Sequence, residues 1–301
     1  GTQATQARKP YMPKEPLTEA LSARRQGFFI YRNTLIPAYE RNTNMTEKEL
    51  TDIVREAATK METSHFSVAQ KGGYANIVTS SDIAVQEFLC RRLAEALPGS
   101  GFLCEEEDMN DTAHDYTWII DPIDGTCNYS RGIEHCAICV GLMHSGRMEM
   151  SAVFIPATDE MFHASRSNGA FLNGRRISVS HRPFADALLC TAMPVYHKEH
   201  ARECAAIILD AFGECNDFRR FGAAAPELCY LAAGRCELYF EYLLSPWDYA
   251  AASLIVEEAG GIITRPDLTP LTLTNPCGVT AANTEANLKR LGEIVARHIN
   301  Q

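Results

Sequence analysis

The sequence has no long hydrophobic run and no excess of basic residues. No apolar stretch approaches the roughly 18–20 residues of a membrane-spanning helix, and the first segment, "GTQATQARKPYMPKEP", lacks the apolar centre of a secretory signal. The 28 Lys and Arg residues are outnumbered by 38 Asp and Glu residues, giving a formal net charge of -10. Nucleic acids are bound through clustered Lys and Arg. We therefore expect a cytoplasmic protein that binds neither nucleic acid nor membrane.

Several motifs of common enzyme classes are also missing. The sequence has no GxGxxG fingerprint, no GxSxG nucleophile elbow and no HExxH zinc motif, and "GAFLNGRR" lacks the Lys-Ser/Thr pair that would complete a P-loop. The nine histidines do not cluster as metal ligands do. The eleven cysteines are scattered, mostly in apolar segments such as "EFLCRRL". This usage indicates free, buried thiols in a reducing compartment.

The order of strand-like and helix-like segments along the chain predicts an α/β (α+β) fold of layered sheets and helices. Residues 1–44 show weak periodicity and are interpreted as an N-terminal extension, followed by a domain over 45–301 with sub-lobes at about 45–185 and 186–301. "TEKELTDIVREAATKM" opens with a Thr-x-x-Glu capping box and continues with helical spacing. A second helix is expected from about Asp82 to Leu97, and strand-like runs then give way to alternating helices and strands.

Acidic residues gather where apolar runs end. In "WIIDPIDGTCNY" the run Trp118 to Ile120 is followed by Asp121 and Asp124, while Glu105 to Glu107 end another predicted strand and Asp248 falls in the first turn of a predicted helix. Each group alone has an ordinary explanation: a turn, a solvated loop or a helix cap. However, two carboxylates at the end of a buried strand are costly unless a cation lies between them. Oxygen ligands of this kind suit Mg²⁺.

The residues after the two aspartates favour anion binding. Gly125 lets the backbone approach a ligand, and Thr126 can begin a helix whose exposed N–H groups suit a phosphate. Carboxylates for a metal beside a phosphate site indicate metal-assisted phosphoryl transfer or hydrolysis.

At this point the sequence resembles the inositol monophosphatase family of Mg²⁺-dependent, lithium-sensitive phosphatases. "FLCEEE", "WIIDPIDGTCNY" and "SPWDYAAASLIVEEAGG" are similar to three family motifs in the same order, and "VTSSD" and "GAFLNGRRISVS" have counterparts as well. The resemblance runs from about residue 46 to 298. It implies an α-β-α-β-α sandwich of the sugar-phosphatase type, two to three Mg²⁺ per site and a homodimer.

The resemblance also implies roles for individual residues. A first Mg²⁺ would be held by Glu105, Asp121 and the carbonyl of Ile123, and a second by Asp121, Asp124 and Asp248. The catalytic residues would be Glu105, Thr126 and Asp82, with Thr126 hydrogen-bonded to Asp82 to orient the attacking water. The substrate-binding residues would be Asp124, Gly125, Thr126, Gly222, Ala223, Ala224 and Glu241. Lys71 falls where the family has a lysine near the site.

The substrate implied is inositol-1-phosphate or a related sugar or polyol phosphate. Fructose-1,6-bisphosphate, histidinol phosphate and 3′-phosphoadenosine 5′-phosphate remain alternatives, although Cys127-Asn128-Tyr129 replaces the Lys-Glu-aromatic run of the nucleotidases. A bisphosphatase would need an extra basic contact, for which Arg131 and Arg219 are candidates.

Three further points stay open in the sequence. A protein with this fold could instead serve as a regulatory binding partner. Ala223 replaces the usual hydroxyl residue of the family, and "IEHC" departs from its pattern. Cys127, in a variable position of the signature, could make the site sensitive to oxidation.

Overall fold

The computed structural model describes residues 45–62, 67–70, 77–106 and 110–299, all within the compact unit Met45–Gln301. In these ranges no helix has both the length and the apolar character that crossing a bilayer demands. Whether this unit divides into two sub-lobes, as the sequence predicts, stays a prediction.

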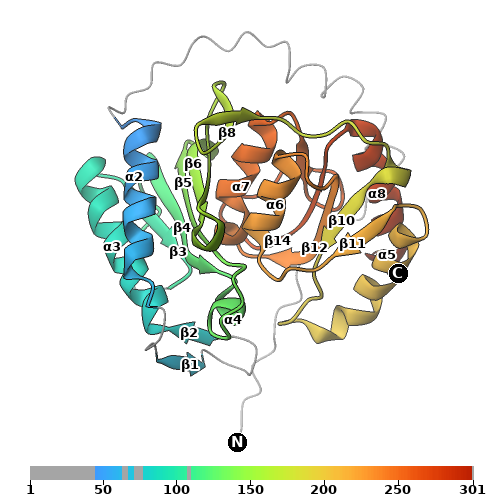
Figure 1. Ribbon diagram of the computed structural model, residues 1–301, viewed down its shortest axis with the longest axis horizontal. Coiled ribbons are helices and arrows are strands. Elements are labelled where there is room, and N and C mark those ends of the chain that lie inside the picture. Colours follow the sequence, from blue (N-terminus) through green and yellow to red (C-terminus); the bar gives the residue numbers. More distant parts are fainter. Residues whose placement is uncertain (1–44, 63–66, 71–76, 107–109, 300–301) are drawn as a thin grey trace, which may run out of the picture. The chain divides into compact units, whose positions relative to one another are not determined.

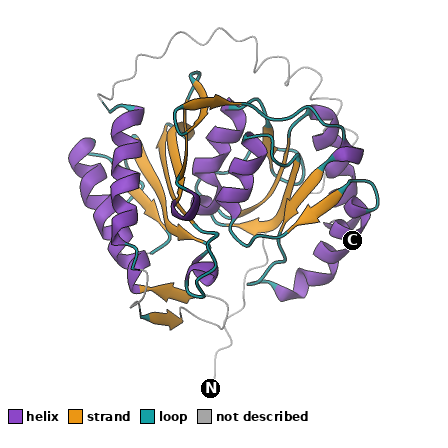
Figure 2. Ribbon diagram, viewed as in Figure 1, coloured by secondary structure: helices purple, strands orange, loops and turns teal. Residues whose placement is uncertain are grey.

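Five layers of helices and sheets make up the described unit (Figures 1 and 2). The outer helices α2 (Glu47–Ala57) and α3 (Ser80–Ala96) cover one face of a seven-stranded sheet. Helices α6 (Ala224–Ala232) and α7 (Pro246–Glu258) lie between this sheet and a five-stranded sheet. The far face of the second sheet is covered by α5 (Ala201–Phe212) and α8 (Glu285–Ile299). The predicted α-β-α-β-α sandwich is confirmed.

The seven-stranded sheet has the order β3-β4-β5-β6-β7-β8-β9, and only its β3–β4 pair is parallel. Its strands are β3 (Gly101–Cys104), β4 (Tyr116–Asp124), β5 (Ala137–His144), β6 (Arg147–Ile155), β7 (Glu160–Ser165), β8 (Gly169–Leu172) and β9 (Arg175–Ile177). A hairpin at Ser145-Gly146 joins β5 to β6.

The five-stranded sheet has the order β11-β10-β12-β14-β13 and is mixed, because β10 pairs in parallel with β11 and β12. Its strands are β10 (Leu188–Thr191), β11 (Asp217–Arg219), β12 (Leu238–Leu244), β13 (Ile262–Thr264) and β14 (Cys277–Ala282). A separate pair, β1 (Val68–Gln70) and β2 (Ile77–Thr79), and a short helix, α4 (Thr126–Tyr129), complete the described elements that concern the site.

Capping explains where the first two helices begin. The predicted capping box of α2 is present, because Thr46 and Glu49 exchange side-chain and backbone hydrogen bonds. Helix α3 begins at Ser80, two residues before the expected start at Asp82. The reason is that Thr79 is the N-cap and Asp82 is the third helical residue of a second capping box.

Side-chain alternation along β4 decides which way its acidic end faces. Trp118 and Ile120 pack with α2 and α3, whereas Ile119 packs in the cluster that contains α6 and α7. Because successive strand residues point to opposite faces, Asp121 lies on the same face as Ile119. A carboxylate is thus directed toward the helix layer that carries Asp248.

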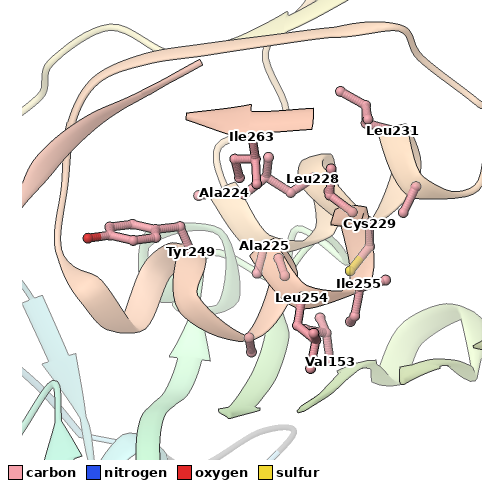
Figure 3. Packing of buried hydrophobic residues seen from close by; sticks show 14 of the residues in the cluster. Val153, Ala224, Ala225, Leu228, Cys229, Leu231, Tyr249, Leu254, Ile255 and Ile263 are labelled. Atoms are coloured by element: carbon pink, nitrogen blue, oxygen red, sulfur yellow. The ribbon is translucent and has the colours of Figure 1, made fainter. Parts of the chain in front are cut away.

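Buried apolar residues fill the spaces between the layers in separate clusters. Figure 3 shows part of the central cluster, in which Leu228 and Cys229 of α6 lie near Leu254 and Ile255 of α7 and Val153 of β6. Helix α7 is buried along nearly its whole length. This packing fixes the helix start from which Asp248 projects.

Candidate functional site

A pocket of about 210 Å³ lies where the end of β4 meets the starts of α6 and α7. This volume is several times the space that a single water needs, so the pocket suits a small ligand. Its lining includes the catalytic, metal-binding and substrate-binding residues that the family resemblance implies, except Asp82: Glu105, Asp121, Ile123, Asp124, Gly125, Thr126, Gly222, Ala223, Ala224, Glu241 and Asp248. Residues far apart in the chain therefore meet at one place.

Asp82 lies directly behind Thr126. The Thr126 Oγ1 is 3.1 Å from Oδ1 of Asp82 and 2.9 Å from the carbonyl oxygen of Ile123. The other oxygen of Asp82 accepts hydrogen bonds from the backbone N–H and the hydroxyl of Thr79, at 2.8 and 2.5 Å. The predicted Thr126–Asp82 contact is present, and the α3 capping box holds the carboxylate in place.

The two aspartates of the signature belong to β4 itself rather than following it. The pairing of β4 with β5 is irregular between Asp121 and Asp124, so the strand is distorted where both carboxylates enter the pocket. Oδ1 of Asp121 accepts the N–H of Ile123 at 3.0 Å, and Oδ2 of Asp124 accepts the N–H of Ala225 at 2.6 Å. The second contact joins the end of β4 to the first turn of α6.

Asp248 does two things at the start of α7. Its Oδ2 accepts the N–H of Ser245 at 2.7 Å in a capping box, so the ordinary reading of a helix cap is correct. Asp248 also lines the pocket with Asp121 and Glu105. One carboxylate thus caps its helix and contributes charge to the pocket.

The electrostatics of the pocket are dominated by crowded acids. Burial, together with the charges of Glu105, Asp124 and Asp248, raises the pKa of Asp121 well above its ordinary value. Burial and the charges of Asp124 and Glu105 do the same for Asp248, and burial raises the pKa of Asp124 to about 6. Within the described ranges, no three His, Cys, Asp or Glu side chains are arranged so that they would hold a metal ion as they stand.

Glu241 and Glu227 add two more acids at the side of the pocket formed by β12 and α6. Glu241 accepts a hydrogen bond from the Tyr239 hydroxyl at 2.6 Å, and burial raises its pKa to about 7. Sequence reasoning missed Glu227. Its Oε1 accepts the N–H groups of Phe221 and Gly222 at 2.9 and 3.0 Å. The signal was available, because Glu227 is a charged residue inside an otherwise apolar helix.

Asn128 holds the segment before α6 against the signature. Its Nδ2 donates to the carbonyl oxygens of His135 and Phe221, both at 2.8 Å. The ring of Phe221 also lies against the His135 ring, tilted by 30° and with centroids 4.8 Å apart. Asn128 belongs to the signature motif, but only the structure reveals this bridging contact.

Gly125 is the N-cap of α4 and lies close to Ala223, the residue before α6. Its φ of +89° is in the left-handed region, which favours glycine. A Cβ at this position would lie 3.0 Å from both the Cβ of Ala223 and the carbonyl oxygen of His135. The need for a glycine, expected from the sequence, therefore has a specific steric cause.

The cysteines are free in the described part of the chain, and Cys127 is the exposed one among them. Cys127 also lines the pocket. Cys136 and Cys139 of "CAIC" are buried. Lys71 and Glu107 lie outside the described residues.

Comparisons with known proteins give one consistent result. The model of the inositol monophosphatase family matches residues 40–300. Nus factor SuhB of Escherichia coli strain K12 is 38% identical over 208 residues, which are 68% of this chain and 78% of that protein. An inositol-1-monophosphatase of Rhizobium meliloti strain 1021 is 39% identical over 202 residues, 66% of this chain and 76% of that protein.

Solved structures agree with these sequence relatives. The extragenic suppressor protein suhB of Bartonella henselae matches with a TM-score of 0.78 and 30% identity over 84% of this chain and 98% of that one. The inositol monophosphatase of Anabaena sp. PCC 7120 matches with a TM-score of 0.73 and 27% identity over 83% of this chain and 95% of that one. With its acid-lined pocket and layered fold, this chain belongs to the inositol monophosphatase family.

Proposed function

We propose that this protein hydrolyses a phosphate monoester with Mg²⁺ as cofactor, and that the substrate is inositol-1-phosphate or a related sugar or polyol phosphate. The observation that carries the proposal is the cluster of Glu105, Asp121, Asp124 and Asp248 in one pocket. Burial and the charges of the neighbouring acids raise the pKa values of Asp121 and Asp248, and a divalent cation would replace this repulsion by attraction.

The donor set fits Mg²⁺, which prefers oxygen ligands. Glu105, Asp121 and the carbonyl of Ile123 would hold one ion, and Asp121, Asp124 and Asp248 a second, after the carboxylates turn toward one another. When bound, Mg²⁺ supplies Lewis acidity: it lowers the pKa of the attacking water and offsets charge on the leaving oxygen.

The chain's own residues would orient the attacking water. The Thr126 hydroxyl has one hydrogen, and both nearby acceptors, Asp82 Oδ1 and the Ile123 carbonyl, compete for it. Toward the pocket the Thr126 oxygen can therefore only accept a hydrogen bond, which would come from the water. Glu105, which also lines the pocket, would accept a hydrogen bond from the other hydrogen of that water. This arrangement directs a lone pair of the water at phosphorus.

The remaining predicted residues would hold the substrate. The N–H groups of Gly125 and Thr126 would bind the phosphate, and the carboxylate of Glu241 would accept hydrogen bonds from substrate hydroxyls. Glu241 is fixed in position by the Tyr239 hydroxyl. Gly222, Ala223 and Ala224 form the adjoining wall.

Phosphate release from a substrate panel tests the proposal. The panel comprises inositol-1-phosphate, fructose-1,6-bisphosphate, histidinol phosphate and 3′-phosphoadenosine 5′-phosphate, each with Mg²⁺ and with excess chelator. We expect Mg²⁺-dependent release that is greatest for inositol-1-phosphate and is inhibited by Li⁺. The Asp121→Asn variant should be inactive, since it removes the carboxylate assigned to both ions. Full activity in chelator, or in Asp121→Asn, would contradict the mechanism.

A regulatory role is the second candidate, and the name of one group of relatives, Nus factor SuhB, favours it. Asp121→Asn separates the two functions. A cellular phenotype that survives in this variant, although turnover is lost, would assign that phenotype to partner binding rather than to hydrolysis.

We also propose that the protein is a cytoplasmic homodimer, as the family resemblance implies. Light scattering coupled to size exclusion would measure the mass in solution. A single species at the 33.3 kDa of one chain would contradict the dimer.

A further inference from the structure

We propose that Arg220 recognises a second negatively charged group on the substrate, so that, of two otherwise matched phosphate monoesters, the pocket favours the one that also carries another phosphate or a carboxylate. The inference rests on the proposed phosphatase function and concerns the substrate class of the same pocket. It starts from the charge of the pocket lining. Among the described lining residues, Arg220 is the single basic one, whereas several acids line the same pocket.

The Arg220 side chain is available for a ligand. It is exposed at the pocket, and no carboxylate of the described residues pairs with its guanidinium. Its neighbour Arg219 differs, because Arg219 is paired with Asp217 and does not line the pocket. Arg131 is also outside the lining. The extra basic contact that a bisphosphate would need is thus offered by Arg220 rather than by either residue considered from the sequence.

The position of Arg220 places it on the substrate side of the pocket. A Cβ at Gly222 would lie 3.7 Å from Nη1 of Arg220, which locates the guanidinium beside the proposed substrate wall. Its positive charge also acts on Glu241. Glu241 belongs to β12, whereas Glu105 and Thr126, proposed to orient the water, follow β3 and β4. Arg220 is therefore suited to contact the part of the substrate beyond the reacting phosphate.

Local hydrogen bonds hold the backbone on which Arg220 is mounted. The next residue, Phe221, donates its N–H to Glu227 and accepts a hydrogen bond from Asn128. A fixed backbone reduces the entropy that the arginine loses on binding. A guanidinium offers paired N–H donors that match the oxygens of phosphate and carboxylate. Arg220 and Glu241 together would select a substrate with both an anionic group and hydroxyls.

Matched substrate pairs test this role and distinguish the two anions. Fructose 1-phosphate is compared with fructose-1,6-bisphosphate, and glycerol 3-phosphate with 3-phosphoglycerate, by kcat/KM at saturating Mg²⁺. A hydrogen bond to a charged group contributes enough to change these ratios by roughly ten- to a hundredfold. We expect the wild type to prefer the doubly charged member of at least one pair. Arg220→Gln should abolish that preference while leaving kcat/KM for the singly charged member within about threefold.

Arg219→Gln is the control, because it removes a neighbouring positive charge that lies outside the pocket. The control should keep the wild-type preference. Equal activity of the wild type on both members of both pairs, or an equal effect of Arg220→Gln on them, would overturn the inference. If no compound releases phosphate, the proposed function fails. The dissociation constants of the two members of each pair, measured by calorimetry, then replace kcat/KM. If their ratio is the same in the wild type and in Arg220→Gln, the inference is overturned independently of the proposed function.

Discussion

Replacing Gly125 by alanine should both destabilise the fold and damage the site, and a matched substitution separates the two effects. Gly125 and Gly132 lie in the same signature segment and both have positive φ, +89° and +69°. A Cβ at Gly132 would meet nothing within 4 Å, whereas a Cβ at Gly125 would lie 3.0 Å from Ala223 and from the His135 carbonyl. Only Gly125→Ala adds a steric contact to the backbone cost.

The expected free energies follow from these contacts. A non-glycine residue in the left-handed region costs about 1–2 kcal/mol, partly offset by about 0.4–1 kcal/mol because alanine restricts the unfolded chain. Gly132→Ala should therefore lose about 1 kcal/mol. Gly125→Ala should lose about 1–3 kcal/mol more, as typical of overpacking in a close-packed site. Because the new methyl group would push Ala223 away from β4, kcat/KM should fall at least about tenfold.

Urea denaturation measures the stabilities, and phosphate release from inositol-1-phosphate with Mg²⁺ measures activity. Gly132→Ala should keep its activity within about twofold, since its new methyl group meets no atom. Equal losses of stability and activity in the two variants would refute the steric explanation. Loss of activity in Gly132→Ala alone would show that the signature segment affects activity by a cause other than the steric contact at Gly125.

Three further substitutions test other parts of the structure. A hydrogen bond from His163, aided by two others and opposed by burial, lowers the pKa of Glu47 from 4.5 to about 2. Because the folded pKa is lowered, this stabilisation is complete above pH 4.5 and is lost as the pH falls through 2. At pH 7, Glu47→Gln should therefore lower the free energy of unfolding by about 1–2 kcal/mol, allowing for solvent screening. In urea titrations, the difference from the wild type should shrink below pH 4.5. Asn128→Ala should lower the free energy of unfolding, measured in urea, by about 1–3 kcal/mol. It should also lower kcat/KM, because it releases Phe221; unchanged activity would exclude a role of Asn128 in positioning the site. Cys127→Ser should slow inactivation by peroxide, since Cys127 is the exposed thiol of the described residues; an unchanged rate would exclude Cys127 as the target.

Most of the fold could be predicted because its elements carry local signals. The capping box of α2 and the Pro246 start of α7 are sequence features that act within one helical turn. The predicted start of α3 was two residues too late, because either Thr79 or a later residue could have served as the N-cap. The layer order was expected from the family resemblance rather than from any local pattern.

The site was predictable to the extent that its residues lie within motifs. Asp121, Asp124 and Thr126 belong to one segment, and the structure brings Glu105 and Asp248 to the same pocket. Arg220 and Glu227 were missed, because their positions depend on how the segment before α6 packs against the signature. The contact between Asn128 and Phe221 joins residues 93 positions apart, and no spacing rule in the sequence reports it.

The distribution of the acids along the chain has a consequence for how the site comes into being. Asp121 and Asp124 end a strand of the first sheet, and Asp248 begins a helix more than a hundred positions later. If the chain were divided in the connection between β9 and β10, neither fragment would contain a complete set of carboxylates. Activity of the mixed fragments would then report their association. The second Mg²⁺, assigned to Asp121, Asp124 and Asp248, would enter that association equilibrium as a third component, because its ligands come from both fragments.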